Sequence, residues 1–281
     1  MVLDEPSLAA SWPVERGRRL VEQRRPDRTL FLAVDHHPVH GFRIEAPAYG
    51  IHVVAADGRT WVGEPVGEPA WRWSELVFAQ VLPTVAALHG LALLHASAVA
   101  IEGRVHGLLA ASGVGKSSTA AHLVARGAEF FTDDVLALEE IDGRLVAHPG
   151  PRVAKLHADE LAAMTAAARR RLGPPAGEHD GKQHLRPRGP AGPLPLGGLL
   201  FLTRVADGAE VTIEPATDSV PLLLAGAFAP HVATPLRLER QLAVCALAHR
   251  DVALWRVGVP PGCTAADAAG AIWTHLAATR R

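Results

Sequence analysis

The stretch Ala111-Ser112-Gly113-Val114-Gly115-Lys116-Ser117 is the most informative motif of the chain. An apolar run over residues 105–111 precedes it, and an amphipathic run over residues 115–126 follows it. A strand, a glycine-rich loop that ends in Lys-Ser, and a helix are the context that a P-loop requires. In such a loop the backbone N–H groups turn inward around phosphate oxygens, and the helix N-terminus adds partial positive charge. The stretch therefore predicts a site for the phosphates of a nucleotide.

Within this loop, individual side chains have separate expected roles. Lys116 can reach the β- and γ-phosphates, and Ser117 can be a ligand of Mg²⁺, which prefers oxygen ligands. One position departs from the P-loop consensus, because Ala110 stands where a glycine is usual. If position 110 needs a left-handed backbone, alanine costs roughly 1 kcal/mol there. The residues expected to contact the nucleotide are Ser112, Gly113, Val114, Gly115, Lys116, Ser117 and Ser118.

Two adjacent carboxylates follow at Asp133-Asp134, after the apolar run of residues 128–131 and 17 residues beyond Lys116. One helix and one turn separate them from the P-loop, which is where a Walker B carboxylate would lie beside it. Adjacent residues on a strand point to opposite faces. One carboxylate could therefore face Mg²⁺ and the other an acceptor hydroxyl; the alternative is that only one is catalytic and the other caps a turn.

A histidine lies upstream, in the apolar run of residues 93–99. Glu102-Gly103-Arg104 predicts a tight hairpin that returns residues 105–111 alongside this run. Antiparallel pairing about this turn would place His95 and Ser97 near the phosphate end of the hairpin. A lone histidine on a strand is more often a core residue, so its position alone does not assign it a function.

Taken in order, His95-Ala96-Ser97, the P-loop and Asp133-Asp134-Val135 resemble the catalytic core of HPr kinase/phosphorylase. They are more similar still to the smaller HPr-kinase-like proteins of bacterial gene clusters, including those that phosphorylate lasso peptides. The resemblance is firm over residues 85–150 and weaker toward the C-terminus. It implies an α/β fold with a mixed-sheet P-loop kinase core akin to phosphoenolpyruvate carboxykinase, preceded by a small β-rich region.

The resemblance also implies roles for the residues that carry it, with ATP and Mg²⁺ as cofactors. Asp133 would take the proton from an acceptor hydroxyl, and Asp134 would hold Mg²⁺ together with Ser117. His95 would lie in the active site near the phosphoryl group or the first aspartate. Together with Lys116 these side chains would promote in-line transfer of the γ-phosphoryl group, which depends mainly on positioning and charge neutralisation.

The function implied is an ATP- and Mg²⁺-dependent kinase whose acceptor is a serine hydroxyl of a small protein or ribosomal peptide. The alternatives are a small-molecule kinase with the same centre and a non-catalytic nucleotide-binding regulatory protein. Full HPr kinases carry an Arg-Gly signature and a downstream Glu after the aspartates, whereas this chain has His148-Pro149-Gly150-Pro151-Arg152. The resemblance therefore does not extend to phosphorylase activity or to HPr as the substrate. Related kinases are often oligomeric, which suggests a homo-oligomer.

Two regions are predicted, an N-terminal β-rich region with a helix over residues 1–85 and a P-loop kinase domain over residues 86–281. No period is evident in the first 25 residues. Strands are expected at residues 29–34, 42–46, 51–55, 60–62, 91–101, 105–111, 128–133, 135–141, 145–148, 198–203, 211–213 and 252–257. Helices are expected at residues 71–88, bent or started near Pro83, and at 115–126, 157–172, 217–228, 236–249 and 265–279.

The basic residues are unevenly divided, since Lys116, Lys155 and Lys182 are the only lysines among 28 basic residues. Residues 173–195, rich in Gly and Pro, predict a long loop, and loops of that length are often functional. Lys182 lies in this segment, which could close over the γ-phosphate or be a solvated linker, and we assign Lys182 as a second phosphate contact. Lys155 has no predicted role. Other basic residues near it in the segment are His184, Arg186 and Arg188.

Charge and hydropathy exclude several classes of function. With 28 basic and 29 acidic residues, the chain does not have the charge of a nucleic-acid binder or a polybasic membrane anchor. The interval between Glu75 and Glu102 carries no charge and is long enough to cross a bilayer, but Pro83 and Gly90 predict a buried helix and a buried strand. No signal peptide is evident at the N-terminus, so a cytoplasmic protein is expected.

Three further features are interpreted as structural. Two cysteines without a metal-binding spacing predict ordinary free thiols. Asp35, His36, His37 and His40 superficially suggest metal ligands but are interpreted as a surface turn. Arg237 and Arg240 are interpreted as a solvated face of the helix over residues 236–249.

Overall fold

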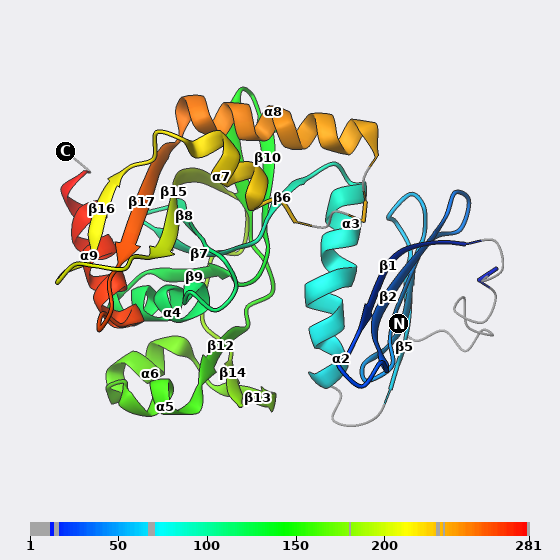
Figure 1. The fold of residues 1–281 in the computed structure, drawn as a ribbon, viewed down its shortest axis with the longest axis horizontal. Coiled ribbons are helices and arrows are strands. Elements are labelled where there is room, and N and C mark those ends of the chain that lie inside the picture. Colours follow the sequence, from blue (N-terminus) through cyan, green and yellow to red (C-terminus); the bar gives the residue numbers. More distant parts are fainter. Residues whose placement is uncertain are drawn as a thin grey trace. The chain divides into compact units, whose positions relative to one another are not determined.

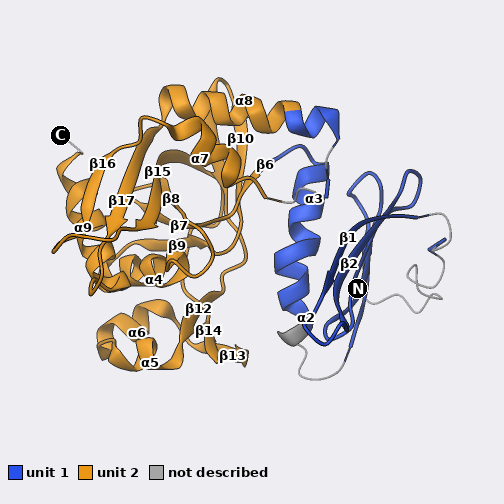
Figure 2. Cartoon of the chain, in the orientation of Figure 1, with its two compact units in different colours: residues 1–91, 229–238 blue, residues 92–228, 239–281 orange. Residues whose placement is uncertain are grey.

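A computed structural model describes residues 12–13, 17–66, 71–179, 181–228, 231–232 and 234–279. The chain divides into two compact units, residues 1–91 with 229–238, and residues 92–228 with 239–281 (Figure 2). The prediction about a signal peptide falls on residues 1–6, outside the described residues. None of the helices in the described ranges has both the length and the apolar character needed to span a bilayer.

The first unit contains a five-stranded antiparallel meander (Figure 1). Its strands, in spatial and chain order, are β1 (Arg18–Arg24), β2 (Leu30–His37), β3 (Gly41–Ala46), β4 (Gly50–Val54) and β5 (Trp61–Pro65). Four of them confirm the predicted strands. The strand β1 was not predicted, because as an edge strand its side chains are exposed or half-buried on both faces and show no period.

One helical segment follows this sheet in the chain. It consists of α2 (Trp71–Leu76), the π-helical turn η2 (Val77–Val81) and α3 (Leu82–Leu88). The predicted irregularity near Pro83 is present as the π-helical turn just before it. Proline has no N–H to donate to the preceding turn, so the regular α pattern is interrupted at this point.

The second unit contains a nine-stranded mixed sheet, which confirms the predicted sheet type. Along its main path the order is β6 (Ala92–Leu94), β10 (Leu136–Ile141), β11 (Arg144–His148), β15 (Leu194–Arg204), β8 (Arg104–Leu109), β7 (Ala96–Ile101) and β9 (Glu129–Thr132). The remaining strands are β17 (Ala253–Val259), which pairs with β15, and β16 (Thr212–Pro215), which pairs with β17. The pairs β8–β15 and β15–β17 are parallel.

The core of this unit lies on both faces of the sheet. Leu108 belongs to an apolar cluster with α4 (Lys116–Arg126) and α9 (Ala265–Ala278), whereas Leu109 belongs to the opposite cluster, which includes residues of α7 (Ser219–Ala225) and α8 (Pro235–Asp251). Successive side chains of a strand point to opposite faces, which explains the division. Because β8 is buried on both faces, the strand that leads into the P-loop is firmly placed.

Two sequence predictions in this unit are wrong. Residues 173–195 are not a long loop, because β13 (Pro175–His179) and β14 (Lys182–Leu185) join β12 (Ala154–His157) in a three-stranded antiparallel sheet. A register shift between Pro175 and Gly177 hides their alternation in the sequence. The helix predicted over residues 157–172 is interrupted, giving α5 (Ala158–Ala163) and α6 (Ala166–Leu172). Buried Met164 lies at this break, and Thr165 caps the second helix by accepting from the Ala168 N–H.

Two predicted surface features also differ from the structure. Asp35, His36 and His37 lie on β2 rather than in a turn, and the Asp35 carboxylate is buried against Arg19 at 2.5 Å. Within the described ranges no group of three metal-ligating side chains is present, there or elsewhere. Arg237 is 5% exposed and thus not solvated, whereas Arg240 is exposed as predicted.

Candidate functional site

The P-loop connects β8 to α4, and its glycines have the backbone that the motif requires. Gly113 and Gly115 have φ values of 81° and 114°, a region that favours glycine. Ala110 does not have a positive φ, so the departure from the consensus causes no backbone strain. The Ala110 carbonyl instead accepts a hydrogen bond of 2.9 Å from Lys116 Nζ.

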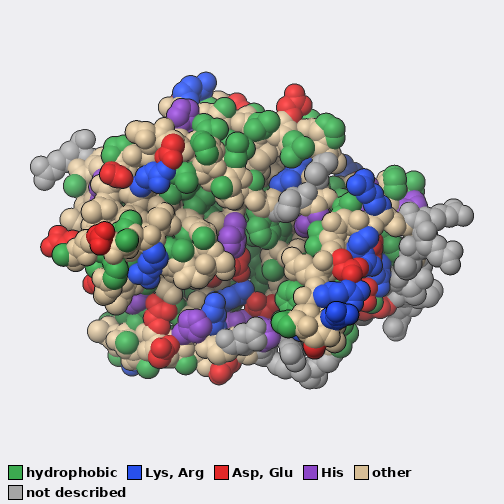
Figure 3. Space-filling model, viewed as in Figure 1, with side chains coloured by type: hydrophobic (Ala, Val, Ile, Leu, Met, Phe, Trp, Pro, Cys, Tyr) green, Lys and Arg blue, Asp and Glu red, His purple; other side chains and the backbone are tan. Residues whose placement is uncertain are grey.

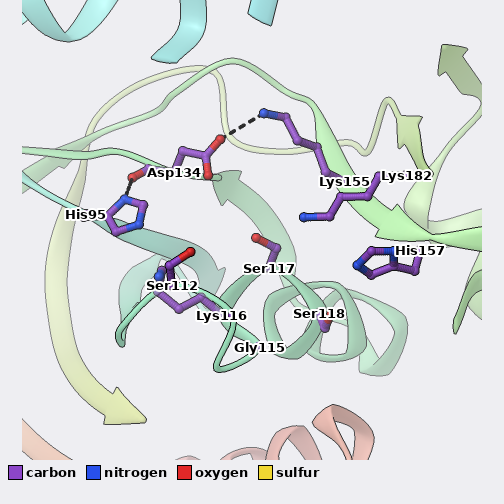
Figure 4. Close-up of a pocket in the computed structure, with 11 residues that line it drawn as sticks. His95, Ser112, Gly115, Lys116, Ser117, Ser118, Asp134, Lys155, His157 and Lys182 are labelled. Carbon is purple, nitrogen blue, oxygen red and sulfur yellow. Dashed lines mark hydrogen bonds and ion pairs between the residues drawn. The ribbon is translucent and has the colours of Figure 1, made fainter. Parts of the chain in front are cut away.

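A cavity of about 250 Å³ lies at the N-terminus of α4 (Figure 4). The P-loop and the first turn of α4 form one wall, and residues of β12 and β14 stand opposite. Basic, histidine and acidic side chains gather over β12 and β14 in the space-filling view (Figure 3). The lining residues are His95, Ser112, Gly113, Gly115, Lys116, Ser117, Ser118, Asp134, Lys155, His157 and Lys182.

Asp133 lies directly after β9 and is bonded to two hydroxyl groups. Its Oδ1 accepts from Ser97 Oγ at 2.5 Å and from Ser117 Oγ at 2.8 Å. Its Oδ2 is buried and has no hydrogen-bond partner among the described residues. Burial and the nearby charge of Asp134 raise the pKa of the Asp133 carboxyl, while the two hydroxyl groups oppose this shift. Ser97 and Ser117 thus orient the carboxylate through Oδ1, and the charge of Lys155 also opposes the rise in its pKa.

Asp134 has a different environment. Its φ of 68° is uncommon for a residue other than glycine, and it turns the chain between β9 and β10. Its Oδ2 lies 3.0 Å from Lys155 Nζ. Burial opposes ionisation of this carboxyl, but the attraction and hydrogen bond of Lys155, with smaller effects of His95 and Lys182, lower its pKa. The pKa values of the two adjacent carboxyl groups are therefore shifted in opposite directions.

His95 interrupts the strand that was predicted over residues 91–101, which is a further correction. Its backbone N–H donates to Gly226 O at 2.7 Å, so β6 ends and β7 begins on either side of it. Its ring stacks on Phe228, with centroids 5.6 Å apart. Nδ1 lies 2.9 Å from Asp134 O, and because a carbonyl oxygen only accepts, Nδ1 carries the proton. The other ring nitrogen faces the cavity (Figure 4).

Lys116 points back onto its own loop, where its ammonium contacts the carbonyl oxygens of Ala110 and Ala111. Burial lowers the pKa of this ammonium, and the charges of Asp133 and Asp134 oppose that effect. Its neighbour Ser118 donates to Glu160 Oε2 at 2.8 Å, so this hydroxyl is bonded to a side chain of α5. A phosphate group in the cavity would give the Lys116 ammonium a stronger partner than backbone carbonyls.

The structure brings most of the predicted residues to one cavity. Asp133 lies behind Ser117 rather than in the cavity wall, and Val114 packs against the core. Lys182 faces the cavity from β14, although the predicted loop around it is a strand. Sequence reasoning assigned no role to Lys155 and His157, which also line it. They are two positions apart on β12 and alternate with buried Ala154 and Leu156, and this alternation was the available signal.

No family model matches the chain, and no curated protein matches it. Among solved structures the chain is similar to the HPr(Ser) kinase/phosphatase from Coxiella burnetii, with a TM-score of 0.36 and 10% sequence identity. The similarity covers 67% of this chain and 99% of that chain. A similarity this distant does not support a function, so the function proposed for this protein rests on the residues of the cavity.

Proposed function

We propose that the protein is an ATP- and Mg²⁺-dependent phosphotransferase that moves a γ-phosphoryl group to a serine hydroxyl of a small protein or ribosomal peptide. The observation that carries the proposal is the hydrogen bond between Ser117 and Asp133 at the edge of the cavity. It joins the P-loop helix to the aspartate turn, so groups that bind phosphate and groups that accept protons share one site. The serine acceptor, a homo-oligomer and a cytoplasmic location stay predictions.

Mg²⁺ fits the carboxylate and hydroxyl oxygens beside the P-loop. The residues that would hold it are Ser117, through Oγ, and Asp133, through the buried Oδ2, which has no hydrogen-bond partner among the described residues. Burial and the adjacent charge of Asp134 raise the pKa of the Asp133 carboxyl. A cation bound there would lower this pKa, because it would offset the buried negative charge. Bound there, the ion would neutralise charge on the phosphate oxygens.

The contacts favour an exchange of the roles that the family resemblance implied for the two aspartates. Asp133 is bonded to Ser117 and does not line the cavity, whereas Asp134 faces the cavity beside His95. We therefore assign Asp133 to the metal side with Ser117, and Asp134 to the acceptor side. His95 holds the Asp134 backbone through its Nδ1–H and turns its other ring nitrogen toward the reacting groups.

The proposed reaction is an in-line transfer of the γ-phosphoryl group. The acceptor hydroxyl oxygen forms a bond to the γ-phosphorus while the bond from that phosphorus to the β,γ-bridging oxygen breaks. The hydroxyl proton passes to the Asp134 carboxylate, and the electron pair of the broken bond stays on ADP. Lys116, moved from the Ala110 carbonyl to the phosphates, stabilises the charge that develops on them.

Paired variants of the two aspartates test this function. Wild type, Asp133→Asn and Asp134→Asn would be incubated with labelled ATP and a panel of serine peptides, small proteins and hydroxyl-bearing metabolites, and nucleotide affinity would be measured with and without Mg²⁺. We expect Asp134→Asn to lose transfer by at least about 100-fold while retaining Mg²⁺-dependent nucleotide affinity, and Asp133→Asn to lose the Mg²⁺ dependence. Asp207→Asn, at an exposed residue that does not line the cavity, is the matched control.

Each alternative has its own outcome in this experiment. If Asp133→Asn alone loses transfer while its nucleotide affinity still depends on Mg²⁺, then Asp133 is the base and Asp134 the metal ligand, as the resemblance implies. Transfer to metabolites and not to peptides would identify a small-molecule kinase. Tight nucleotide binding by wild type without transfer to any acceptor would identify a regulatory nucleotide-binding protein and overturn the proposal.

A further inference from the structure

The three lysines of the chain lie in one place. Lys116 of α4, Lys155 of β12 and Lys182 of β14 all line the same cavity, and no arginine of the described chain lines it. The other 25 basic residues of the Lys and Arg total are arginines. A lysine ammonium is a compact charge on a flexible stem, whereas an arginine guanidinium is a planar fork that needs more room. The cavity thus concentrates compact, movable positive charge on two opposite walls.

Lys155 is well placed to act from the wall opposite the P-loop. Its side chain is 16% exposed, and its neighbours Ala154 and Leu156 are buried at 3% and 1% exposure. These apolar neighbours anchor β12 in the core, and β14 pairs with it in regular register from Ala154 to His157. The backbone of Lys155 is therefore fixed, while its four-carbon stem lets the ammonium move within the cavity.

One partner of Lys155 is a group that the proposed reaction needs. Its Nζ lies 3.0 Å from Asp134 Oδ2, and Asp134 faces the acceptor side of the cavity. While this ion pair is formed, one carboxylate oxygen is occupied by the ammonium. A phosphoryl group in the cavity brings several oxygen atoms and more negative charge than the carboxylate, so it competes for the same ammonium.

We propose that Lys155 is a catalytic residue that exchanges its ion pair with Asp134 for the transferring phosphoryl group. The inference rests on the proposed function and adds a contact on the side of the phosphoryl group opposite Lys116. The exchange has two consequences that act together. The ammonium stabilises the equatorial oxygens of the phosphoryl group as charge spreads over them, and the Asp134 carboxylate becomes available to the acceptor hydroxyl.

Amine labelling tests this inference on the unaltered protein. An amine-reactive acetylating reagent can modify only the three lysines and the amino terminus, so mass spectrometry assigns every product. The protein would be labelled with and without Mg²⁺ and a non-hydrolysable ATP analogue at about 100 times its Kd, which leaves about 1% of the protein unbound. We expect the analogue to slow acetylation of both Lys116 and Lys155 by at least about tenfold, relative to an added reference peptide that does not bind nucleotide.

Variants of Lys155 supply the kinetic test. We expect Lys155→Met to lower kcat by about 10²- to 10³-fold with a much smaller change in the KM for ATP, because the contact is made to the transferring group. Lys155→Arg keeps the charge and should recover part of the loss. Arg144→Met, which removes one exposed positive charge from β11, is the matched control and should transfer at the wild-type rate.

The two proposals fail in different ways. Protection of Lys116 without protection of Lys155, or wild-type kcat in Lys155→Met, would overturn the role of Lys155 and leave the proposed function intact. No protection of any lysine and no transfer by wild type would overturn the proposed function itself. Because labelling uses the wild-type chain, an unstable variant does not remove the test.

Discussion

The hydroxyl of Ser97 donates a hydrogen bond of 2.5 Å to Asp133 Oδ1. Ser97 is fully buried on β7, so this bond fixes the aspartate from a neighbouring strand rather than from the P-loop. We expect Ser97→Ala to lower kcat about tenfold, which corresponds to a loss of about 1.4 kcal/mol in positioning Asp133. Nucleotide affinity should change little, since the P-loop is untouched.

The control for this prediction is another buried serine of the same unit. Ser219 is 1% exposed and bonds to His249 Nδ1 at 2.6 Å. Ser219→Ala should cost a similar free energy of unfolding, about 1 kcal/mol, without lowering kcat. An equal fall of kcat in both variants would show that the effect of Ser97→Ala is only structural.

Restoring the P-loop consensus glycine at position 110 should not increase nucleotide affinity. Ala110 does not have a positive φ, and it contributes its carbonyl to Lys116 as any residue would. We expect Ala110→Gly to leave nucleotide affinity within about twofold of wild type and to lower stability by up to about 1 kcal/mol. Gly113→Ala, at a φ of 81°, should weaken binding by at least about tenfold because the loop must distort. Titration calorimetry on both variants checks the contrast, and tighter binding by Ala110→Gly would contradict it.

The turn that carries the aspartates depends on a glycine from another segment. A Cβ at Gly150 would lie 2.1 Å from Thr132 Oγ, and Thr132 is fully buried immediately before Asp133. We expect Gly150→Ala to destabilise the fold by about 1–3 kcal/mol and to lower transfer by displacing the turn. Gly192→Ala is the control, because a Cβ there has no neighbour within 4 Å and its φ is not positive. Denaturant unfolding of the two variants should separate them, and equal stabilities would refute the close contact.

Protonation of a buried histidine should make the first unit sensitive to acid. His52 is fully buried, its Nδ1 accepts from Trp61 Nε1 at 3.1 Å, and burial lowers its pKa from 6.5 to about 4. The unfolded chain takes up this proton near pH 6.5, whereas the folded protein takes it up only near pH 4. Stability from neutral His52 is therefore present above pH 6.5 and is lost as the pH falls to about 4, on the order of 3 kcal/mol in total.

His52→Gln keeps an acceptor for Trp61 and removes the titrating group. Its free energy of unfolding should depend less on pH than that of wild type between pH 6.5 and 4, measured by denaturant titration at several pH values. His40→Gln, an exposed histidine in the same unit, should retain the wild-type dependence. Identical pH profiles of His52→Gln and wild type would assign the acid sensitivity to other groups.

The parts of the fold and site that could be predicted from sequence are those with local signals. The P-loop between an apolar strand and an amphipathic helix, and the aspartate pair after another apolar strand, place Lys116, Ser117 and Asp133 without knowledge of the tertiary structure. The strand β1 gave no signal because its side chains are mostly exposed. The strands β13 and β14 were missed because glycine, proline and a register shift interrupt their alternation.

The relations between distant residues could not be predicted in the same way. Adjacent strand residues were expected to face opposite sides, but a left-handed backbone at Asp134 ends that alternation. The choice of Asp133 as the partner of Ser117, and of Asp134 as the partner of Lys155, follows from this turn. Likewise, the break at His95 results from its bond to Gly226, far along the chain, and not from local propensity.

The position of β15 in the sheet determines when the nucleotide site can form during synthesis of the chain. This strand pairs with β8, which leads into the P-loop, yet it lies much later in the chain, and its parallel partner β17 comes later still. A nascent chain that has reached residue 193 on the ribosome already contains Lys116, Ser117 and both aspartates, but β8 lacks one of its two neighbours. Nucleotide binding should therefore begin only after residues 194–204 have emerged, and pairing over such a separation makes this a slow step of folding.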